Sequence, residues 1–253
     1  MSLVDGRGWT ITCLDETEST NRDMAEAAKA GAAGWSVEIS DYQSGGRGRF
    51  ERRWIAPRGT ALATSLLIYP TRDFRDWGWL SLIVGMAITR VLSTYAPGRV
   101  ELKWPNDVLI GNKKVCGILS ERVGEAAICG WGLNIDMTAD QLPVPTATSL
   151  LIEKIDVDRT VLCAQILTQV ASLIDRWESG DDLTDLYQDE CATIGRRVAV
   201  HLDQDRPDEH SLIADAIGID RCGALIVVDS SGSKLALSSG DVVHIRKGHE
   251  KND

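Results

Sequence analysis

The pattern of apolar and polar residues near the start of the chain changes from a strand period to a helix period and back. Residues 9–16 and 35–42 alternate as strands do. Between them a helical period follows Ser19 or Thr20, either of which can cap the free backbone N–H groups, and Gly31 ends it. The pattern therefore predicts a strand, a helix and a second strand.

The middle of the chain combines long helices with extended runs. A largely apolar helix is predicted over 77–98, and an amphipathic helix over 158–180 with Asp158 as its expected cap. The other predicted elements are a short helix at 183–191 and strands, joined by Asn, Asp and Gly turns, at 59–70, 99–105, 106–122 and 125–135. These patterns predict an α+β domain over residues 1–192, with a mixed or antiparallel sheet flanked by helices.

From about Gly195 the pattern changes to short strands separated by turn residues. They are expected at 196–202, 210–219, 224–229, 234–238 and 242–247. Short strands this close together are typical of a small closed barrel, because closure removes the unpaired edges of a sheet. We therefore expect residues 193–253 to form a second, smaller domain.

Composition supports a folded protein and limits where it acts. With 253 residues, 43% of them hydrophobic, the chain can bury a sizeable core. It has no run of about 18 uncharged apolar residues, and its start lacks the basic-then-apolar order of a secretory signal. These features argue against a membrane or exported protein, so a cytoplasmic location is expected. The six cysteines lack a C-x-x-C pair, which favours reduced structural thiols over disulfides or a zinc site.

Charge and motif searches exclude several kinds of chemistry. A net charge of −10 argues against general nucleic-acid binding. All four histidines lie in the C-terminal part, so a Ser-His-Asp or Cys-His site in the larger domain has no base. The phosphate loop G-x-x-x-x-G-K-[ST] is absent, and "GRGRFE" departs from the dinucleotide fingerprint at Glu51. Any site for an anionic ligand must therefore be local and of another type.

The segment "YQSGGRGRFERRW" is the strongest local candidate for such a site. Its glycines let the backbone approach a ligand closely, while Arg47 and Arg49 present forked donors suited to phosphate or carboxylate. The alternative is a solvated loop whose arginines offset nearby carboxylates. Trp54 could stack on a base, although a place in the core is the commoner fate of tryptophan.

Several motifs, taken together, resemble one known family. The series "ESTN", "QSGGRGR" ending at Trp54, "KWPND", "KKVCGILSE" and "GWGLNI" is similar, in order and spacing, to the catalytic domain of biotin protein ligases. The resemblance implies a biotin/lipoate ligase-like catalytic domain followed by an SH3-like barrel. It also implies that biotin and ATP, with Mg²⁺, form biotinyl-5'-AMP, which then acylates a lysine of a biotin carboxyl carrier domain of a carboxylase.

The resemblance also assigns residues to roles. Lys114, Arg49 and Arg47 would be catalytic, meeting the negative charge on carboxylate and phosphate oxygens. The residues that would bind biotin are Ser19, Thr20, Asn21, Gln43, Gly46, Arg47, Gly48, Arg49, Lys114, Gly117, Gly130 and Gly132. Those that would bind the nucleotide are Arg49, Arg52, Trp54, Lys114 and Asn134. For Ser19 and Thr20 the other interpretation is simple helix capping. No metal ligands are assigned, because Asp107 could orient Lys103, hold magnesium or only form a turn.

Some positions depart from the family pattern. Phe50 and Glu51 follow Arg49 where the family often has a glycine, so closure of the arginine loop is in question, and Trp131 is bulkier than expected. Because "ESTN" begins at residue 18, no DNA-binding domain is expected before the catalytic domain. A homodimer and a role for Arg246 beside the nucleotide are left open.

Two alternative functions remain at this point. A ligase for lipoate or octanoate would use the same scaffold, and a non-catalytic biotin or nucleotide sensor would keep the binding residues without the chemistry. The basic "GRGR" loop argues against the first, and Lys114 together with both arginines argues against the second.

Overall fold

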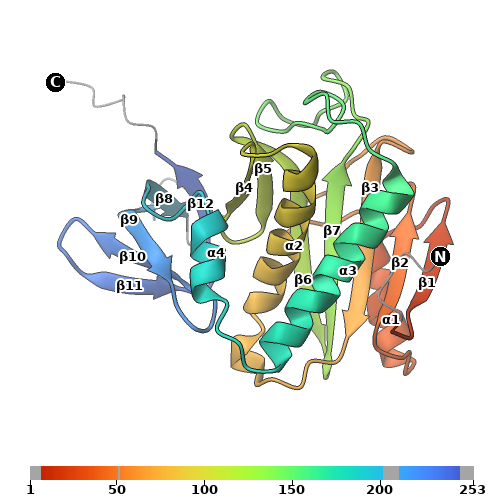
Figure 1. Cartoon of the computed structure of the whole chain (residues 1–253), viewed down its shortest axis with the longest axis horizontal. Coiled ribbons are helices and arrows are strands. Elements are labelled where there is room, and N and C mark those ends of the chain that lie inside the picture. Colours follow the sequence, from red (N-terminus) through yellow and green to blue (C-terminus); the bar gives the residue numbers. More distant parts are fainter. Residues whose placement is uncertain (1–6, 51, 202–210, 246–253) are drawn as a thin grey trace.

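The structure, a computed structural model, describes residues 7–50, 52–201 and 211–245 and contains a large and a small β-sheet (Figure 1). The large sheet has seven strands in the order β1-β2-β3-β7-β6-β5-β4. Only β1 and β2 pair in parallel, so the sheet is mixed, as predicted. Its strands are β1 (Thr10–Leu14), β2 (Ser36–Ser40), β3 (Ala61–Ile68), β4 (Val100–Lys103), β5 (Asp107–Ile110), β6 (Lys113–Val123) and β7 (Ala126–Asn134).

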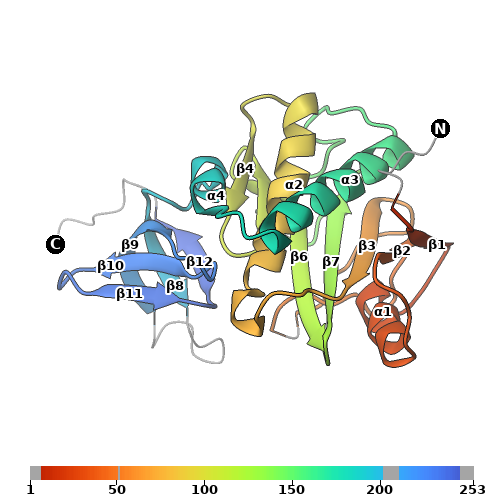
Figure 2. The same ribbon diagram turned by 60° about the horizontal axis from the view of Figure 1, so that its bottom comes forward.

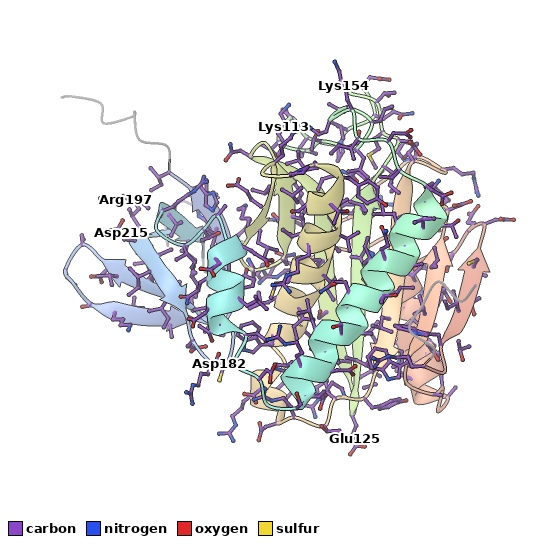
Figure 3. The ribbon with its side chains drawn as sticks, viewed as in Figure 1. Lys113, Glu125, Lys154, Asp182, Arg197 and Asp215 are labelled. Atoms are coloured by element: carbon purple, nitrogen blue, oxygen red, sulfur yellow. The ribbon has the colours of Figure 1, made fainter. Side chains whose placement is uncertain are left out.

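The predicted length of one strand was wrong. The run predicted as a single strand over 106–122 is divided into β5 and β6 by a turn at Gly111 and Asn112. Both residues have positive φ angles, 58° and 64°, which suits the tight turns that join antiparallel strands. Figure 3 shows Lys113 at one end of β6 and Glu125, in the turn that follows it, at the other.

Helices cover both faces of the large sheet. Helices α2 (Trp79–Tyr95) and α3 (Arg159–Glu178) cross one face (Figure 1), and α1 (Thr20–Lys29) lies against the other, as Figure 2 shows after rotation. Alternation along the strands explains the division: Leu66 packs in the main core with α2 and α3, whereas Leu67 packs with Met24 of α1. The predicted α+β class with helices flanking a mixed sheet is therefore confirmed.

The helix ends agree with most of the sequence signals. Asp158 caps α3 by accepting a hydrogen bond from the Val161 backbone N–H at 2.9 Å, and Gly31 follows α1 with a φ of 83°. Ser19 or Thr20 was expected to cap α1 with its side chain, and the structure shows no such capping bond from Ser19. Ser19 occupies the cap position in an extended conformation, but its hydroxyl makes no capping hydrogen bond and is buried.

The small sheet follows α4 (Thr184–Glu190), and its strand order is β11-β10-β9-β8-β12. Its strands are β8 (Arg197–His201), β9 (Ser211–Ile219), β10 (Leu225–Asp229), β11 (Lys234–Leu237) and β12 (Asp241–His244). Within the described residues β11 pairs only with β10 and β12 only with β8, so the closed barrel predicted here is not observed. Arg197 and Asp215, opposite each other on β8 and β9, lie together in Figure 3. Arg246 falls outside the described residues.

The two sheets are held together by the turn between β9 and β10. The indole N–H of Trp79 donates to the Arg221 carbonyl at 2.8 Å, and that of Trp104 donates to the Gly223 carbonyl at 3.1 Å. Just after the C-terminal end of α4, the Ala192 N–H donates to the carbonyl of Leu102 in β4 at 2.8 Å. Because both indoles are buried, these bonds satisfy polar groups that would otherwise be left without partners.

The cysteines of the chain are free thiols, most of them in the interior. All six cysteines are free, and four of them, Cys116, Cys129, Cys163 and Cys191, are buried. Burial raises the pKa of Cys116 above its usual range and that of Cys129 to about 12, so both stay protonated thiols. The length and apolar character of the helices bear on whether the chain crosses a membrane. Among the described residues, no helix has the length and apolar character needed to cross a bilayer.

The close packing at this junction generates a prediction for Gly78, which precedes α2. A Cβ atom at this position would lie 2.7 Å from the backbone oxygen of Cys222, which cannot move without shifting the turn. We expect Gly78→Ala to lower the free energy of unfolding by about 1–3 kcal/mol, as overpacking does. Urea denaturation measures this loss. Gly8→Ala is the control, because its Cβ would meet nothing within 4 Å; equal midpoints for the two variants would contradict the prediction.

Candidate active site

Two neighbouring cross-strand rows form the floor of the candidate site, on the face covered by α1. Residues opposite each other on adjacent strands point to the same face. One row consists of Thr12, Glu38, Ser65, Gly130 and Leu119, and the other of Ser40, Ala63, Gly132, Gly117 and Asp107. Three glycines predicted to lie near the ligand, Gly117, Gly130 and Gly132, are thus brought together at the centre of this floor.

The glycines are needed because other side chains lie directly on them. A Cβ atom on Gly130 would be 1.8 Å from Asn21 Oδ1, and one on Gly132 would be 2.5 Å from the Trp54 indole. On Gly117 it would be 2.8 Å from Lys114 Cε. Asn21, Trp54 and Lys114, which belong to three different segments predicted to bind ligand, therefore meet on one glycine surface.

A polar network joins the start of α1 to the sheet. Gln43 Oε1 accepts hydrogen bonds from the Thr20 backbone N–H at 2.8 Å and from Thr20 Oγ1 at 3.1 Å. Ser65 Oγ lies 2.7 Å from Thr20 Oγ1 and 2.6 Å from Asn21 Oδ1. Sequence reasoning missed Ser65, although a serine within the apolar run "ALATSLLI" was a signal that something polar contacts it.

A second missed residue, Glu121, connects this network to the arginine loop. Asn21 Nδ2 donates to Glu121 Oε2 at 2.7 Å and to the Leu119 carbonyl at 3.1 Å. Arg47 Nη2 lies 3.3 Å from Glu121 Oε1, and its side chain is exposed. Arg47 therefore stands at the rim of the floor, paired with an acid of β6.

Lys114 has a close acidic partner. Its Nζ lies 2.5 Å from Asp107 Oδ1, at the end of the second row, while Lys103 Nζ lies 3.6 Å from Asp107 Oδ2. The sequence left the role of Asp107 open, and the structure shows that it pairs with both lysines and most closely with Lys114. Within the described ranges no three His, Cys, Asp or Glu side chains are grouped so that they could hold a metal ion.

Arg49 and Arg52 reach the small sheet. Arg49 Nη1 donates to the Gly240 carbonyl at 3.2 Å, and Arg52 Nη2 donates to Asp241 Oδ2 at 2.6 Å. Burial lowers the pKa of Arg49, and the charges of Asp241 and Asp107 oppose this effect. Burial alone would raise the pKa of Asp241, but the hydrogen bond and charge of Arg52 outweigh it and lower that pKa. The loop is thus held at the small sheet by Gly240 and by Asp241, the first residue of β12.

The positions that depart from the family pattern have different outcomes. Phe50 has a φ of 57°, a conformation that glycine adopts more readily, and its ring lies 4.7 Å from the Arg49 guanidinium. Trp131 belongs to the main core and is only 4% exposed, so it does not narrow the site. Glu51 lies outside the described residues.

Two of the remaining predicted residues lie at the margins of the floor. Asn134 is buried one row beyond Gly132; its Nδ2 donates to the Thr148 carbonyl at 2.9 Å, and its Oδ1 has no partner among the described residues. Gly46 is held by the Trp54 backbone, whose oxygen would be 2.7 Å from a Cβ there. Gly48 has room for a Cβ, since the nearest atom is 3.5 Å away, so its role is not steric.

The site is nearly filled by its own side chains. The cavity bounded by Gln43, Trp54 and Ala63 has a volume of about 10 Å³. That is room for roughly one water molecule, whereas small-ligand sites enclose about 300–1,000 Å³. Trp54, which lies on Gly132 and Gly117, takes the space between the arginine loop and the sheet.

Comparisons with known proteins agree with this arrangement. Residues 13–134, which contain the glycine floor and the arginine loop, match the model of the biotin/lipoate A/B protein ligase family. The chain is 35% identical to a biotin–[acetyl-CoA-carboxylase] ligase of Mycobacterium tuberculosis, over 95% of this chain and 91% of that protein. It is 29% identical to the bifunctional ligase/repressor BirA of Escherichia coli, over 92% of this chain and 76% of that protein.

A solved structure supports the fold. The biotin protein ligase from Aquifex aeolicus in complex with biotin and ATP superposes with a TM-score of 0.79 at 24% identity, covering 94% of this chain and 99% of that one. The fold and the glycine floor thus define a protein of the biotin/lipoate ligase class. Within that class, the chain belongs to the family of biotin–[acetyl-CoA-carboxylase] ligases.

The contact between Gly130 and Asn21 can be tested by a double-mutant cycle. We expect Gly130→Ala to destabilise the protein by about 1–3 kcal/mol, because the new methyl group displaces Asn21 and leaves buried polar groups unpaired. In an Asn21→Ala background the same change should cost clearly less, because the clashing oxygen is gone. Denaturant unfolding of the four proteins measures the coupling, and additive effects would show that the two side chains do not meet.

Proposed function

We propose that this protein uses ATP to form biotinyl-5'-AMP and then transfers the biotinyl group to a lysine of a biotin carboxyl carrier domain. The observation that carries the proposal is the position of Lys114 against Gly117, beside Asp107. Arg47 pairs with Glu121 at the rim of the floor, and the charge of Asp107 also acts on Arg49. In a chain with a net charge of −10, such a local group of cations suits a ligand with several anionic oxygens.

The first step needs charge stabilisation more than proton transfer. A biotin carboxylate oxygen attacks the α-phosphorus of ATP, the bond from that phosphorus to the bridging oxygen breaks, and pyrophosphate leaves. Lys114, aligned by Asp107, lies against the reacting oxygens as a compact charge, and Arg49 and Arg47 donate to the carboxylate and phosphate oxygens. In the second step the carrier amine attacks the anhydride carbonyl, loses a proton and releases AMP.

Biotin is proposed to lie over the first cross-strand row. Thr20, Asn21 and Gln43 supply the donors and acceptors for its ureido ring, and Ser65 holds two of them in place. Ser19, buried at the start of α1 without a capping bond, is free to contribute its hydroxyl. Gly46, Gly48, Gly117, Gly130 and Gly132 let the ligand approach the backbone.

The nucleotide is proposed to occupy the second row and the loop. Asn134 offers an acceptor without a partner among the described residues, Arg52 reaches the phosphates, and Trp54 covers the adenine or the intermediate. Since the present cavity is far smaller than either substrate, Trp54 and the loop before it must lift from the glycines when ligands bind.

Magnesium is proposed to enter with ATP. The described residues offer no cluster of three metal-binding side chains, and Asp107, the carboxylate in the floor, is paired with lysines. These residues do not fit a resident magnesium site. An ion bound mainly by the ATP phosphates and water agrees with the usual coordination of Mg²⁺ beside nucleotides.

The domain boundary and the partners are also part of the proposal. Residues 1–192 would form the catalytic domain, and residues 193–253 an SH3-like domain whose Gly240 and Asp241 hold the arginine loop. The carrier is proposed to be a carboxylase subunit, in line with the name of the M. tuberculosis relative. A homodimer formed through an edge of the large sheet stays a prediction.

The proposed reaction predicts a direct assay result. With radiolabelled biotin and Mg·ATP, the protein should form biotinyl-adenylate, and Lys114→Ala should reduce kcat about 10²–10³-fold with KM little changed, since the interaction strengthens in the transition state. Lys113→Ala is the control, because Lys113 is exposed at the start of the same strand. Binding of biotin without any adenylate would favour the sensor alternative, and preference for lipoate or octanoate would favour the other one.

Arg49 gives a second prediction, about retention of the intermediate. Without its guanidinium the adenylate loses a buried donor, so Arg49→Gly should still form it but release it, labelling bystander lysines of an added protein. Arg53→Gly serves as the control, because Arg53 is an exposed residue of the same loop. Rapid gel filtration measures the adenylate retained, and retention equal to that of the wild type would remove Arg49 from this role.

A further inference from the structure

Two acidic residues near the start of α1, Asp23 in the helix and Glu38 in the sheet, have no part in the mechanism above. Glu38 lies on β2, between Thr12 of β1 and Ser65 of β3, and is only 6% exposed. Its Oε1 is buried and has no hydrogen-bond partner among the described residues. Its neighbour is Asp23 of α1, so two carboxyl groups meet at a buried position.

Within the part of the chain that the structure describes, the charged group that acts on Glu38 is another acid, Asp23. Thr12 and Ser65, opposite Glu38 on the adjacent strands, are uncharged. On the segment before α1 and on the first turns of the helix, Glu16 pairs with Arg58 and Glu18 pairs with Arg22, both at exposed positions. Burial, together with the hydrogen bond and charge of Asp23, raises the pKa of Glu38 to about 7. Near neutral pH Glu38 is therefore protonated part of the time.

Asp23 is tied to the residues that form the polar network of the site. Thr17 Oγ1 donates a hydrogen bond to Asp23 Oδ2. Thr17 also pairs with the segment that carries Gln43: its N–H donates to the Tyr42 carbonyl at 3.1 Å, and its carbonyl accepts from the Ser44 N–H at 3.0 Å. Gln43 in turn accepts from Thr20, and Thr20 contacts Ser65 beside Glu38. Hydrogen bonds thus connect Asp23, through Thr17 and the segment of Gln43, to Thr20 and Ser65 in the proposed biotin site.

We propose that Asp23 and Glu38 share one proton and act as positioning residues, holding the start of α1 on the sheet so that Thr20 and Gln43 face the ligand. When the proton is lost, the negative charge of buried Glu38 faces that of Asp23. Their repulsion moves Asp23, Thr17 and the first turn of α1 away from the sheet. Affinity for biotin then falls at alkaline pH. This inference rests on the proposed function for the identity of the ligand.

The test compares biotin affinity and stability across pH. Equilibrium dialysis with radiolabelled biotin gives Kd between pH 6 and pH 9 for the wild type, Glu38→Gln and Asp23→Asn. We expect wild-type affinity to fall as pH rises above 7, by up to about tenfold per pH unit if binding requires the proton. Glu38→Gln should not show this fall, because its amide N–H donates to Asp23 as the protonated acid does. Asp23→Asn, which supplies the donor from the other side, should also remove it.

Stability supplies a second measurement that does not depend on the ligand. The folded-state pKa of Glu38 is raised, so its contribution to stability is complete at low pH and is lost as pH rises through about 7. The wild type should therefore lose stability relative to Glu38→Gln as pH rises from about 4.5 to about 7.5, and the difference should change little above that. The control is Glu26→Gln, an exposed acid on the same helix that pairs with Lys29, and it should keep the wild-type pH profile.

The outcomes separate the possible failures. Parallel pH profiles of Kd for the wild type and Glu38→Gln would overturn the positioning role, and so would a pH-dependent difference in stability without any change in biotin affinity. A shift in kcat at saturating biotin, rather than in Kd, would also overturn it. If the wild type bound no biotin at any pH, the proposed function would fail, while the unfolding curves would still support or refute the shared proton.

Discussion

The close approach of side chains to a glycine surface is the constraint on which the site depends. Gly117, Gly130 and Gly132 lie on β6 and β7, at the centre of a sheet whose opposite face is covered by α2 and α3. A single methyl group on Gly130 would occupy the place of Asn21. The core therefore supports these strands from one face, while the absence of glycine side chains leaves room for other groups on the opposite face. Packing on one face of the sheet and recognition on the other are consequences of the same alternation.

The cations of the site are held by acids from distant parts of the chain. Arg47 pairs with Glu121 of β6, Arg52 with Asp241 of β12, and Lys114 with Asp107 of β5. Each pair keeps a flexible side chain near the floor before any ligand is present. The more exposed pairs of Arg47 and Arg52 contribute only about 0–1 kcal/mol each, so an anionic ligand can replace their carboxylates at little cost. An acidic chain can in this way carry a strongly cationic site without leaving those charges unpaired.

Much of the fold could be predicted from the sequence because most elements carry local signals, such as Asp158 at the start of α3 and Gly31 after α1. What failed was tertiary in origin. The division of residues 106–122 depends on a two-residue turn within a continuous apolar pattern, and the missing capping bond of Ser19 reflects burial of its side chain. At the site, Asn21, Trp54 and Lys114 lie on the glycine surface, and the roles assigned to them stay predictions. Ser65 and Glu121 were missed because their role comes from register: Ser65 lies opposite Gly130, and Glu121 lies two residues beyond Leu119 on the same face.

The bonds from Arg49 to Gly240 and from Arg52 to Asp241 join positions 191 and 189 residues apart. A ribosome makes the chain from its N-terminus, and domains generally fold as they emerge. The glycine floor can therefore assemble before β12 has been made, but Arg49 and Arg52 lack these two bonds until Gly240 and Asp241 have emerged. A polypeptide that stopped before β12 would thus display the floor with an arginine loop held only from the large sheet, through Arg47 and Glu121.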